Sequence, residues 1–173
     1  MTPRPTSEAL VATAEQLIGD RVARVADVGT GSGAIAAALA VALPRARVSA
    51  TDSDAAAVAL ARANVRRLGL AGRVQVYRGD LLEPVPGRFD LVVANLPYLP
   101  VAEAARHPDL AAEPADAVFA AGDGLDPYRR LVAAARRRLR PDGSLVIQLR
   151  GHVLVASRRE LDEPGPLVEA LAA

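Results

Sequence analysis

The sequence predicts an α/β fold built on a doubly wound, mostly parallel sheet with the strand order 3-2-1-4-5. Short runs rich in Val, Leu and Ile alternate with longer segments of helical periodicity, which is the pattern of a parallel sheet covered by helices on both faces. A glycine-rich turn follows the first of these strands. Right-handed crossovers place that strand in the centre of the sheet beside the fourth, if the chain reverses its winding after the third strand.

The amino-terminal half of the chain supplies the first three strands. Thr6 or Ser7 can cap an opening helix that runs to about Ile18 with an apolar stripe along one face. Pro44 ends the second helix because proline lacks a backbone N–H, and Gly69 closes the third. The three strands are predicted at residues 22–28, 47–51 and 73–77, and the second and third helices at residues 34–43 and 54–68.

The carboxyl-terminal half is predicted to contain a strand, a helix, a second strand and a short edge strand. These elements are expected at residues 89–94, 127–140, 144–149 and 153–156, respectively. The carboxyl-terminal strands are therefore shortened, and the sheet is expected to keep an exposed edge. Pro100, Pro108 and Pro114 interrupt a long connection at residues 99–126, and a loop of that length in a compact domain usually carries function.

Composition limits the classes of protein to which the chain can belong. Its 173 residues suit a single domain, residues 1–173, and its net charge of +1 gives no reason to expect a nucleic-acid partner. The absence of cysteine excludes disulfides, thiolate metal sites and a cysteine nucleophile, and the two histidines lack nearby ligand partners, so no metal is expected. No apolar run resembles a signal peptide or a membrane span, which predicts a cytoplasmic protein without membrane contact.

The glycine-rich turn, Asp27 to Gly33, is the first candidate binding site. Gly29, Gly31 and Gly33 allow the backbone to turn sharply and to approach a ligand closely, and the following helix offers free N–H groups at its start. The spacing also fits the relaxed dinucleotide fingerprint. Asp52 ends the second strand and would bind ribose hydroxyls in either case.

Two later motifs favour S-adenosylmethionine over a nicotinamide. Asp80 follows the third strand, where an acid can hold an adenine amino group. Asn95-Leu96-Pro97-Tyr98 follows the fourth strand, at the edge where open α/β sheets bind ligands. Its side-chain amide, restricted backbone and aromatic ring are the groups needed to hold a planar nitrogen nucleophile, and a dehydrogenase does not need them. The sequence therefore favours a methyltransferase acting on a planar nitrogen.

These motifs resemble the HemK/PrmC family, the protein-(glutamine-N5) methyltransferases of peptide chain release factors. The resemblance covers the catalytic domain only and runs from about Pro3 to Leu149. Many methyltransferases share the glycine turn, so the segment from Gly122 to Arg129 is the most specific part. The matching segments are residues 3–8, 27–35, 51–52, 59–64, 95–98, 113–114 and 122–129.

The resemblance implies a Rossmann-like class I S-adenosylmethionine-dependent methyltransferase fold, with S-adenosylhomocysteine as product. It implies that the Asn95 side chain and the Leu96 carbonyl accept hydrogen bonds from the substrate amide and that Tyr98 shapes the pocket. Leu96 replaces a proline of the family pattern, but Pro97 still favours an extended residue 96. The residues expected to contact the cofactor are Asp27, Gly29, Thr30, Gly31, Gly33, Asp52, Ser53, Asp80, Leu81 and Asn95.

The chain departs from the family at both ends. We expect the family's helical amino-terminal domain, which docks the release factor, to be absent, and residues 152–173 to be too few for the family's last elements. A partner subunit could supply the docking function. Two alternatives stay open: a nucleic-acid methyltransferase acting on adenine-N6 or guanine-N2, with Tyr98 stacking on an extruded base, and a degenerate cofactor-binding domain without activity.

Overall fold

A computed structural model of the chain describes residues 5–106, 118–120, 122–163 and 165–172. Its helices are α1 (Pro5–Ile18), α2 (Ala34–Ala42), α3 (Ala55–Arg67), α4 (Asp126–Arg138) and α5 (Pro166–Ala170), with 3-10 turns η1 (Val101–Arg106) and η4 (Glu160–Asp162). Its strands are β1 (Ala23–Val28), β2 (Ala46–Asp52), β3 (Val74–Arg78), β4 (Phe89–Ala94), β5 (Leu99–Pro100), β6 (Phe119–Ala120), β7 (Leu139–Leu149) and β8 (His152–Ser157).

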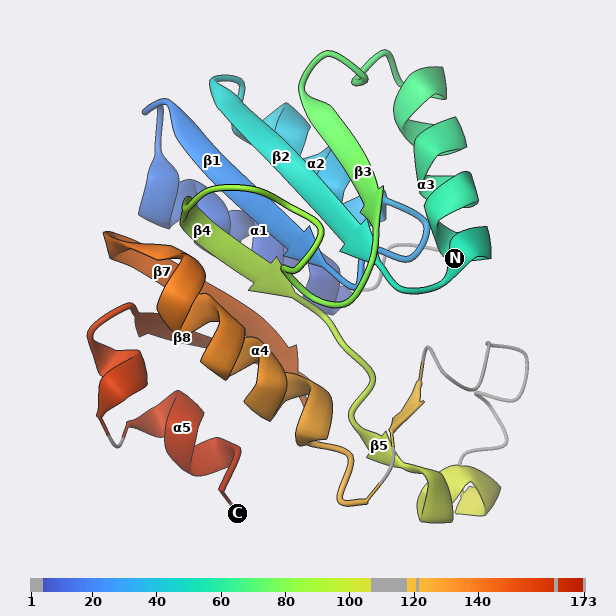
Figure 1. Cartoon of the computed structure of the whole chain (residues 1–173), viewed down its shortest axis with the longest axis vertical. Helices are drawn as coiled ribbons and strands as arrows, with labels where there is room; N and C mark the ends of the chain where they lie inside the picture. The colour runs from blue at the N-terminus through green and yellow to red at the C-terminus, as the bar shows by residue number, and fades with distance from the viewer. Residues whose placement is uncertain (1–4, 107–117, 121, 164, 173) are drawn as a thin grey trace.

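The main sheet has six strands in the order β3-β2-β1-β4-β7-β8 (Figure 1). The first five run parallel, and β8 pairs antiparallel with β7 over the whole length of β8. The predicted order 3-2-1-4-5 is confirmed, with β7 as the fifth strand. The predicted short edge strand is β8, and in the described part of the chain no further strand pairs with its outer edge.

Helices cover the sheet on both faces. On one face α1 packs over β4 and β7, α2 over β1 and β2, and α3 over β2 and β3, and they bury aliphatic side chains against the sheet. On the other face α4 packs over β7, and η4 and α5 pack over β8, around a core that contains Phe89 and Tyr128. These two rings are the largest fully buried side chains. With few aromatic residues available, Ala, Val and Leu fill most of the remaining core.

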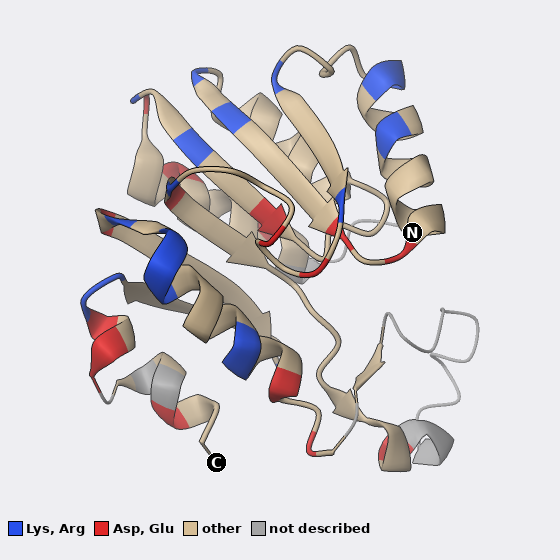
Figure 2. Ribbon diagram, viewed as in Figure 1, with Lys and Arg blue, Asp and Glu red and all other residues tan. Residues whose placement is uncertain are grey.

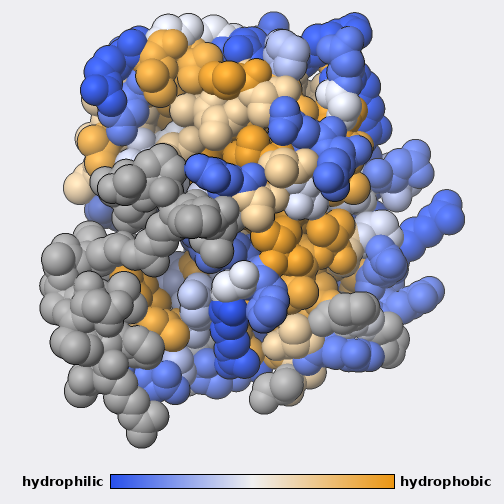
Figure 3. Space-filling model, turned by 180° about the vertical axis from the view of Figure 1, so that it is seen from behind, coloured by the Kyte–Doolittle hydropathy of each residue, from blue (hydrophilic) through white to orange (hydrophobic). Residues whose placement is uncertain are grey.

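The outer surface of the α1–α3 layer carries apolar side chains dispersed among charged ones, as Figure 3 shows from behind. Leu17, Val41 and Leu60 are exposed on these helices. Dispersed apolar residues of this kind are normal on a soluble surface and need no partner. No helix in the described ranges is both long and apolar enough to cross a membrane.

The boundary between α4 and β7 differs from the prediction. Helix α4 ends at Arg138 instead of residue 140, and β7 begins at Leu139 instead of Ser144. Leu139 is extended and fully buried, and it pairs with Phe89 of β4. Pro141 disfavours helical backbone at Arg140, the residue before it, and the pairing with Phe89 moves the start of the strand back to Leu139.

The long connection after β4 is only partly described. Residues 99–100 and 119–120 form a small parallel pair, β5 with β6. The predicted breaking residues Pro108 and Pro114, and the motif Glu113-Pro114, lie outside the described residues.

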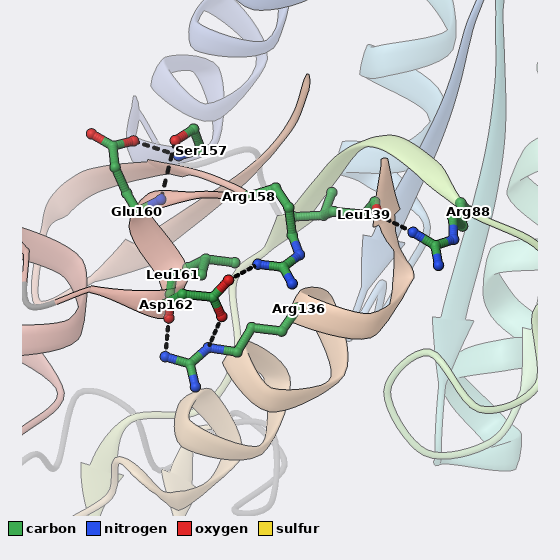
Figure 4. A network of polar contacts seen from close by, with 8 residues as sticks. All are labelled: Arg88, Arg136, Leu139, Ser157, Arg158, Glu160, Leu161 and Asp162. Atoms are coloured by element: carbon green, nitrogen blue, oxygen red, sulfur yellow. Dashed lines mark hydrogen bonds and ion pairs between the residues drawn. The ribbon is translucent and has the colours of Figure 1, made fainter. Parts of the chain in front are cut away.

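Arginines of α4 fasten two irregular segments. The Arg138 guanidinium donates to the carbonyls of Leu82, Val85 and Gly87 in the connection between β3 and β4. At the same end of α4, Arg136 and Arg158 share the carboxylate of Asp162 in η4 (Figure 4). This second cluster lies at the amino-terminal edge of β7 and ties the end of the chain to α4.

We expect Phe89→Ala to lower the free energy of unfolding by about 3–5 kcal/mol. The ring is fully buried, and the guanidinium groups of Arg24 and Arg138 both lie 5.7 Å from its centroid. Urea unfolding of the purified variant measures the loss. Val41→Ala, at a side chain that is 69% exposed, is the control and should change stability by about 0.5 kcal/mol or less. Similar losses in both variants would contradict this account of the core.

Candidate functional site

The carboxyl ends of the parallel strands bring the predicted site residues to one edge of the sheet. β1 lies between β2 and β4, and in this register Val28 is beside both Thr51 and Ala94. The turns that follow these residues therefore meet. Figure 2 shows acidic residues at the ends of β1 and β2, which are Asp27 and Asp52.

The glycine turn is held against the end of β2. The N–H groups of Gly29 and Thr30 both donate to the Thr51 carbonyl at 2.9 Å. The Asn64 side chain donates to the Ser32 carbonyl at 2.9 Å and so ties the turn to α3. At Gly31 a side chain would meet no atom within 4 Å. The space above the middle of the turn is therefore open.

Asp52 is oriented by two backbone donors. The Gly31 N–H donates to its Oδ2 at 2.8 Å, and the Asp54 N–H donates to its Oδ1 at 3.0 Å. Each carboxylate oxygen can accept more than one hydrogen bond, so the group keeps acceptor capacity for a ligand hydroxyl. Ser53, between these residues, is exposed at the same edge.

Asp27 is a buried acid beneath the turn. Thr30 donates its hydroxyl to Asp27 Oδ2 at 2.5 Å, whereas Oδ1 is buried and makes no hydrogen bond to a described residue. Burial raises the pKa of Asp27 to about 6, against the opposing effect of the Thr30 hydroxyl. Asp27 is fully buried, so its carboxylate lies beneath the turn and not on the open side that a ligand could enter.

Asp80 and Leu81 follow β3, the strand next to β2 at this edge. Asp80 forms an ion pair with Arg130 of α4. Residues 80–83 and this side of α4 line a cavity of about 390 Å³. Because both charges are partly exposed, the pair adds little stability, and a ligand amino group could replace the arginine at small cost.

The tetrapeptide after β4 packs directly on the glycine turn. A Cβ atom at Gly29 would lie 2.5 Å from Leu96 Cδ2, so only glycine leaves room for the buried Leu96 side chain. Asn95 is half-buried, and its side-chain amide makes no hydrogen bond with any residue that the structure describes. Pro97 and Tyr98 are half-buried beside it.

Two residues of α4 and its preceding loop support the tetrapeptide from below. The Leu96 N–H donates to the Tyr128 hydroxyl oxygen at 2.9 Å, and that oxygen lies 2.8 Å from the Leu96 carbonyl. A Cβ atom at Gly124 would lie 2.2 Å from the Tyr98 carbonyl oxygen. The segment from Gly122 to Arg129 therefore contacts the tetrapeptide at two points: Tyr128 contacts Leu96, and Gly124 contacts Tyr98.

The family assignment follows from comparison with known proteins. A family described as the methyltransferase small domain matches residues 5–113, which is more than half of the chain. The chain belongs to the methyltransferase small domain family. The structure agrees, because Thermus thermophilus RsmC, a 16S rRNA N2 G1207 methyltransferase solved with AdoMet and guanosine, superposes with a TM-score of 0.62 at 25% identity. That match covers 84% of this chain and 34% of RsmC.

Curated relatives of this methyltransferase small domain confirm the resemblance drawn from the motifs. The release factor glutamine methyltransferase of Gloeobacter violaceus is 46% identical over 86% of this chain and 54% of its own length. The ribosomal protein uL3 glutamine methyltransferase of Bradyrhizobium diazoefficiens is 42% identical over 53% of this chain and 30% of its own. The chain spans about half the length of the release factor relatives it matches.

The structure brings most predicted site residues of this methyltransferase small domain into contact. The glycine turn, Asp27, Thr30 and Asp52 are joined by hydrogen bonds, and Leu96 touches Gly29. Asp80 and Leu81 lie further along the same edge. The sequence interpretation assigned no role to Tyr128 or Gly124, although both lie in the segment that it singled out.

We expect Gly124→Ala to lower the free energy of unfolding by about 2–5 kcal/mol. The backbone at residue 124 is left-handed, which disfavours alanine, and the added Cβ atom would overlap the Tyr98 carbonyl. Gly122→Ala is the matched control, because its φ is also positive but its added Cβ meets nothing within 4 Å. That variant should lose about 1–2 kcal/mol. Thermal unfolding distinguishes the two, and equal losses would refute the close packing at Gly124.

The raised pKa of Asp27 predicts a pH dependence of stability. Its folded pKa of about 6 lies above the ordinary value of 3.8, so the folded state binds the proton more tightly than the unfolded chain. The free energy of unfolding therefore falls by about 3 kcal/mol as the pH rises from about 4 to about 6. Asp27→Asn should remove this loss in urea unfolding without ligand. A wild-type curve parallel to that of the variant would contradict the assignment.

Proposed function

We propose that the chain is the catalytic part of an S-adenosylmethionine-dependent enzyme that methylates the side-chain amide nitrogen, N5, of a glutamine in a protein. The observation that carries the proposal is the position of Asn95 and the Leu96 carbonyl, directly beside the glycine turn. The relatives named for glutamine methylation add support. A peptide chain release factor is the proposed substrate.

The residues at the sheet edge suit S-adenosylmethionine. Asp52 would accept the ribose hydroxyls, Asp80 and Leu81 would hold the adenine, and the open turn at Gly31, which Asp27 supports from beneath, would receive the amino acid portion. When bound, S-adenosylmethionine supplies an electrophilic methyl group on a sulfonium sulfur. The cofactor contacts proposed for Gly29, Thr30, Gly33, Ser53 and Asn95 follow from their positions around the same turn.

The tetrapeptide would hold and activate the nucleophile. A glutamine amide nitrogen is a poor nucleophile because its lone pair is delocalised into the carbonyl, and it gains positive character as it attacks. The Asn95 side-chain oxygen and the Leu96 carbonyl can accept its two N–H groups, which fixes the nitrogen and stabilises the developing charge. Pro97 keeps residue 96 extended, and the ring of Tyr98 would form one wall of the pocket.

The extent of the sequence match supports a release factor as the acceptor. The release factor relatives match over 86% of this chain, and the uL3 relative over 53%. The net charge of +1 gives a nucleic-acid acceptor no comparable support. We propose the cytoplasm as the compartment. We also propose that docking of the release factor falls to a partner subunit or to a segment outside these 173 residues.

Methyl transfer from labelled S-adenosylmethionine to intact release factor tests the proposal. Mass spectrometry should locate the label on a glutamine. We expect Asn95→Ala to lower the transfer rate by about 10²–10³-fold, the effect of removing one preorganised hydrogen bond from a transition state. S-adenosylmethionine affinity, measured by calorimetry, should change little.

Gln75→Ala is the control, because it removes an exposed side-chain amide from β3 and should leave transfer unchanged. Near-normal transfer by Asn95→Ala would refute the role of Asn95. Label on ribosomal RNA alone would show that the acceptor is a nucleic acid, and binding of S-adenosylmethionine without transfer would favour the inactive alternative or a missing partner.

A further inference from the structure

We propose that the hydroxyl of Tyr128 is the positioning group of the tetrapeptide, holding the Leu96 backbone so that its carbonyl and the Asn95 side chain face the methyl acceptor together. The proposal rests on the proposed function for its catalytic meaning. It assigns a further task to α4, which also covers the sheet and holds neighbouring segments through its arginines. Tyr128 touches neither acceptor nor cofactor and would act through Leu96.

The hydroxyl lies where three backbone groups converge. It accepts the Leu96 N–H at 2.9 Å, and it lies 2.8 Å from the Leu96 carbonyl oxygen and 2.5 Å from the Gln148 carbonyl oxygen. Leu96 follows β4 and Gln148 lies at the end of β7, so one side chain joins the ends of two neighbouring strands. The residue is fully buried in the first turn of α4.

The Tyr128 hydroxyl has a single proton, and its direction decides how many lone pairs of the Leu96 carbonyl oxygen stay free for another donor. The hydroxyl can donate to only one carbonyl at a time, and the Gln148 oxygen is the nearer of the two. With the proton directed to Gln148, the Leu96 carbonyl keeps both lone pairs for the acceptor amide. Burial raises the pKa of Tyr128 well above its ordinary value, so the proton stays in place at any working pH.

Leu96 gives this hydroxyl a backbone donor to satisfy. Proline, which occupies the position in the family pattern, has a fixed φ and no N–H. Leucine has no ring to fix its φ, although Pro97 favours an extended backbone there, and it adds a buried N–H. A buried N–H without a partner is costly. Tyr128 satisfies that N–H and at the same time restricts the backbone that leucine has freed.

Tyr128→Phe tests the proposal because it keeps the ring and removes only the hydroxyl. We expect kcat for methyl transfer to fall by about 10- to 100-fold, since a small displacement of a positioned group has this effect. The S-adenosylmethionine Kd and the KM for the acceptor should stay within about twofold. Tyr77→Phe is the matched control, because among the described residues its hydroxyl hydrogen-bonds to the exposed Gln75 side chain of β3, and it should retain full kcat.

Amide hydrogen exchange gives a readout that does not depend on the identity of the acceptor. In the variant, the Leu96 amide should exchange at least about tenfold faster, whereas the Val93 amide inside β4 should be unchanged. If the Leu96 amide loses protection in Tyr128→Phe but the wild type transfers no methyl group, the proposed function is refuted. The contact between Tyr128 and Leu96 is then still supported. An unchanged Leu96 amide would overturn the positioning role, as would unchanged kcat or an equal loss of kcat and cofactor affinity.

Discussion

The packing of the Leu96 side chain on the bare α-carbon of Gly29 joins the two halves of the site. The glycine turn belongs to β1 and the tetrapeptide to β4, and parallel pairing of these strands brings their ends together. Any side chain at position 29 would occupy the space that Leu96 fills. The distance between the glycine turn and the tetrapeptide is therefore set by a contact between apolar atoms, which is stiff because buried cores are densely packed.

Helix α4 and the loop before it support this contact, and hydrogen bonds hold that loop in place. Its preceding loop is closed by Asp123, which accepts the Leu125 N–H and pairs with both terminal nitrogens of Arg129. These bonds hold the pKa of Asp123 at about 2, so the loop stays charged and closed at neutral pH. Arg129 also donates to the Leu171 carbonyl at 2.9 Å. The loop that supports the tetrapeptide is thereby connected to the last turn of the chain.

Sequence patterns predicted the parts of the fold and site that depend on local rules. The glycine turn and the acid at Asp52 stand at fixed offsets from strand ends, and β-strand ends are visible in the apolar runs. The contacts of Tyr128 and Gly124 were not predictable in this way, because they join residues about thirty positions apart whose meeting depends on how α4 lies over β4. The start of β7 was missed for a similar reason: Leu139 is extended because Phe89 pairs with it.

The connection between β3 and β4 shows how one side chain can replace regular secondary structure. No helix or strand forms there, and the Arg138 guanidinium binds the carbonyls of Leu82, Val85 and Gly87 at once. Guanidinium is planar and carries five donors in a fixed arrangement, whereas a lysine ammonium is a compact point charge with three. Positive charge alone is therefore insufficient at position 138, and the shape of this surface loop depends on the planar geometry of the guanidinium groups that bind it, Arg138 and also Arg24, which donates to the Pro86 carbonyl.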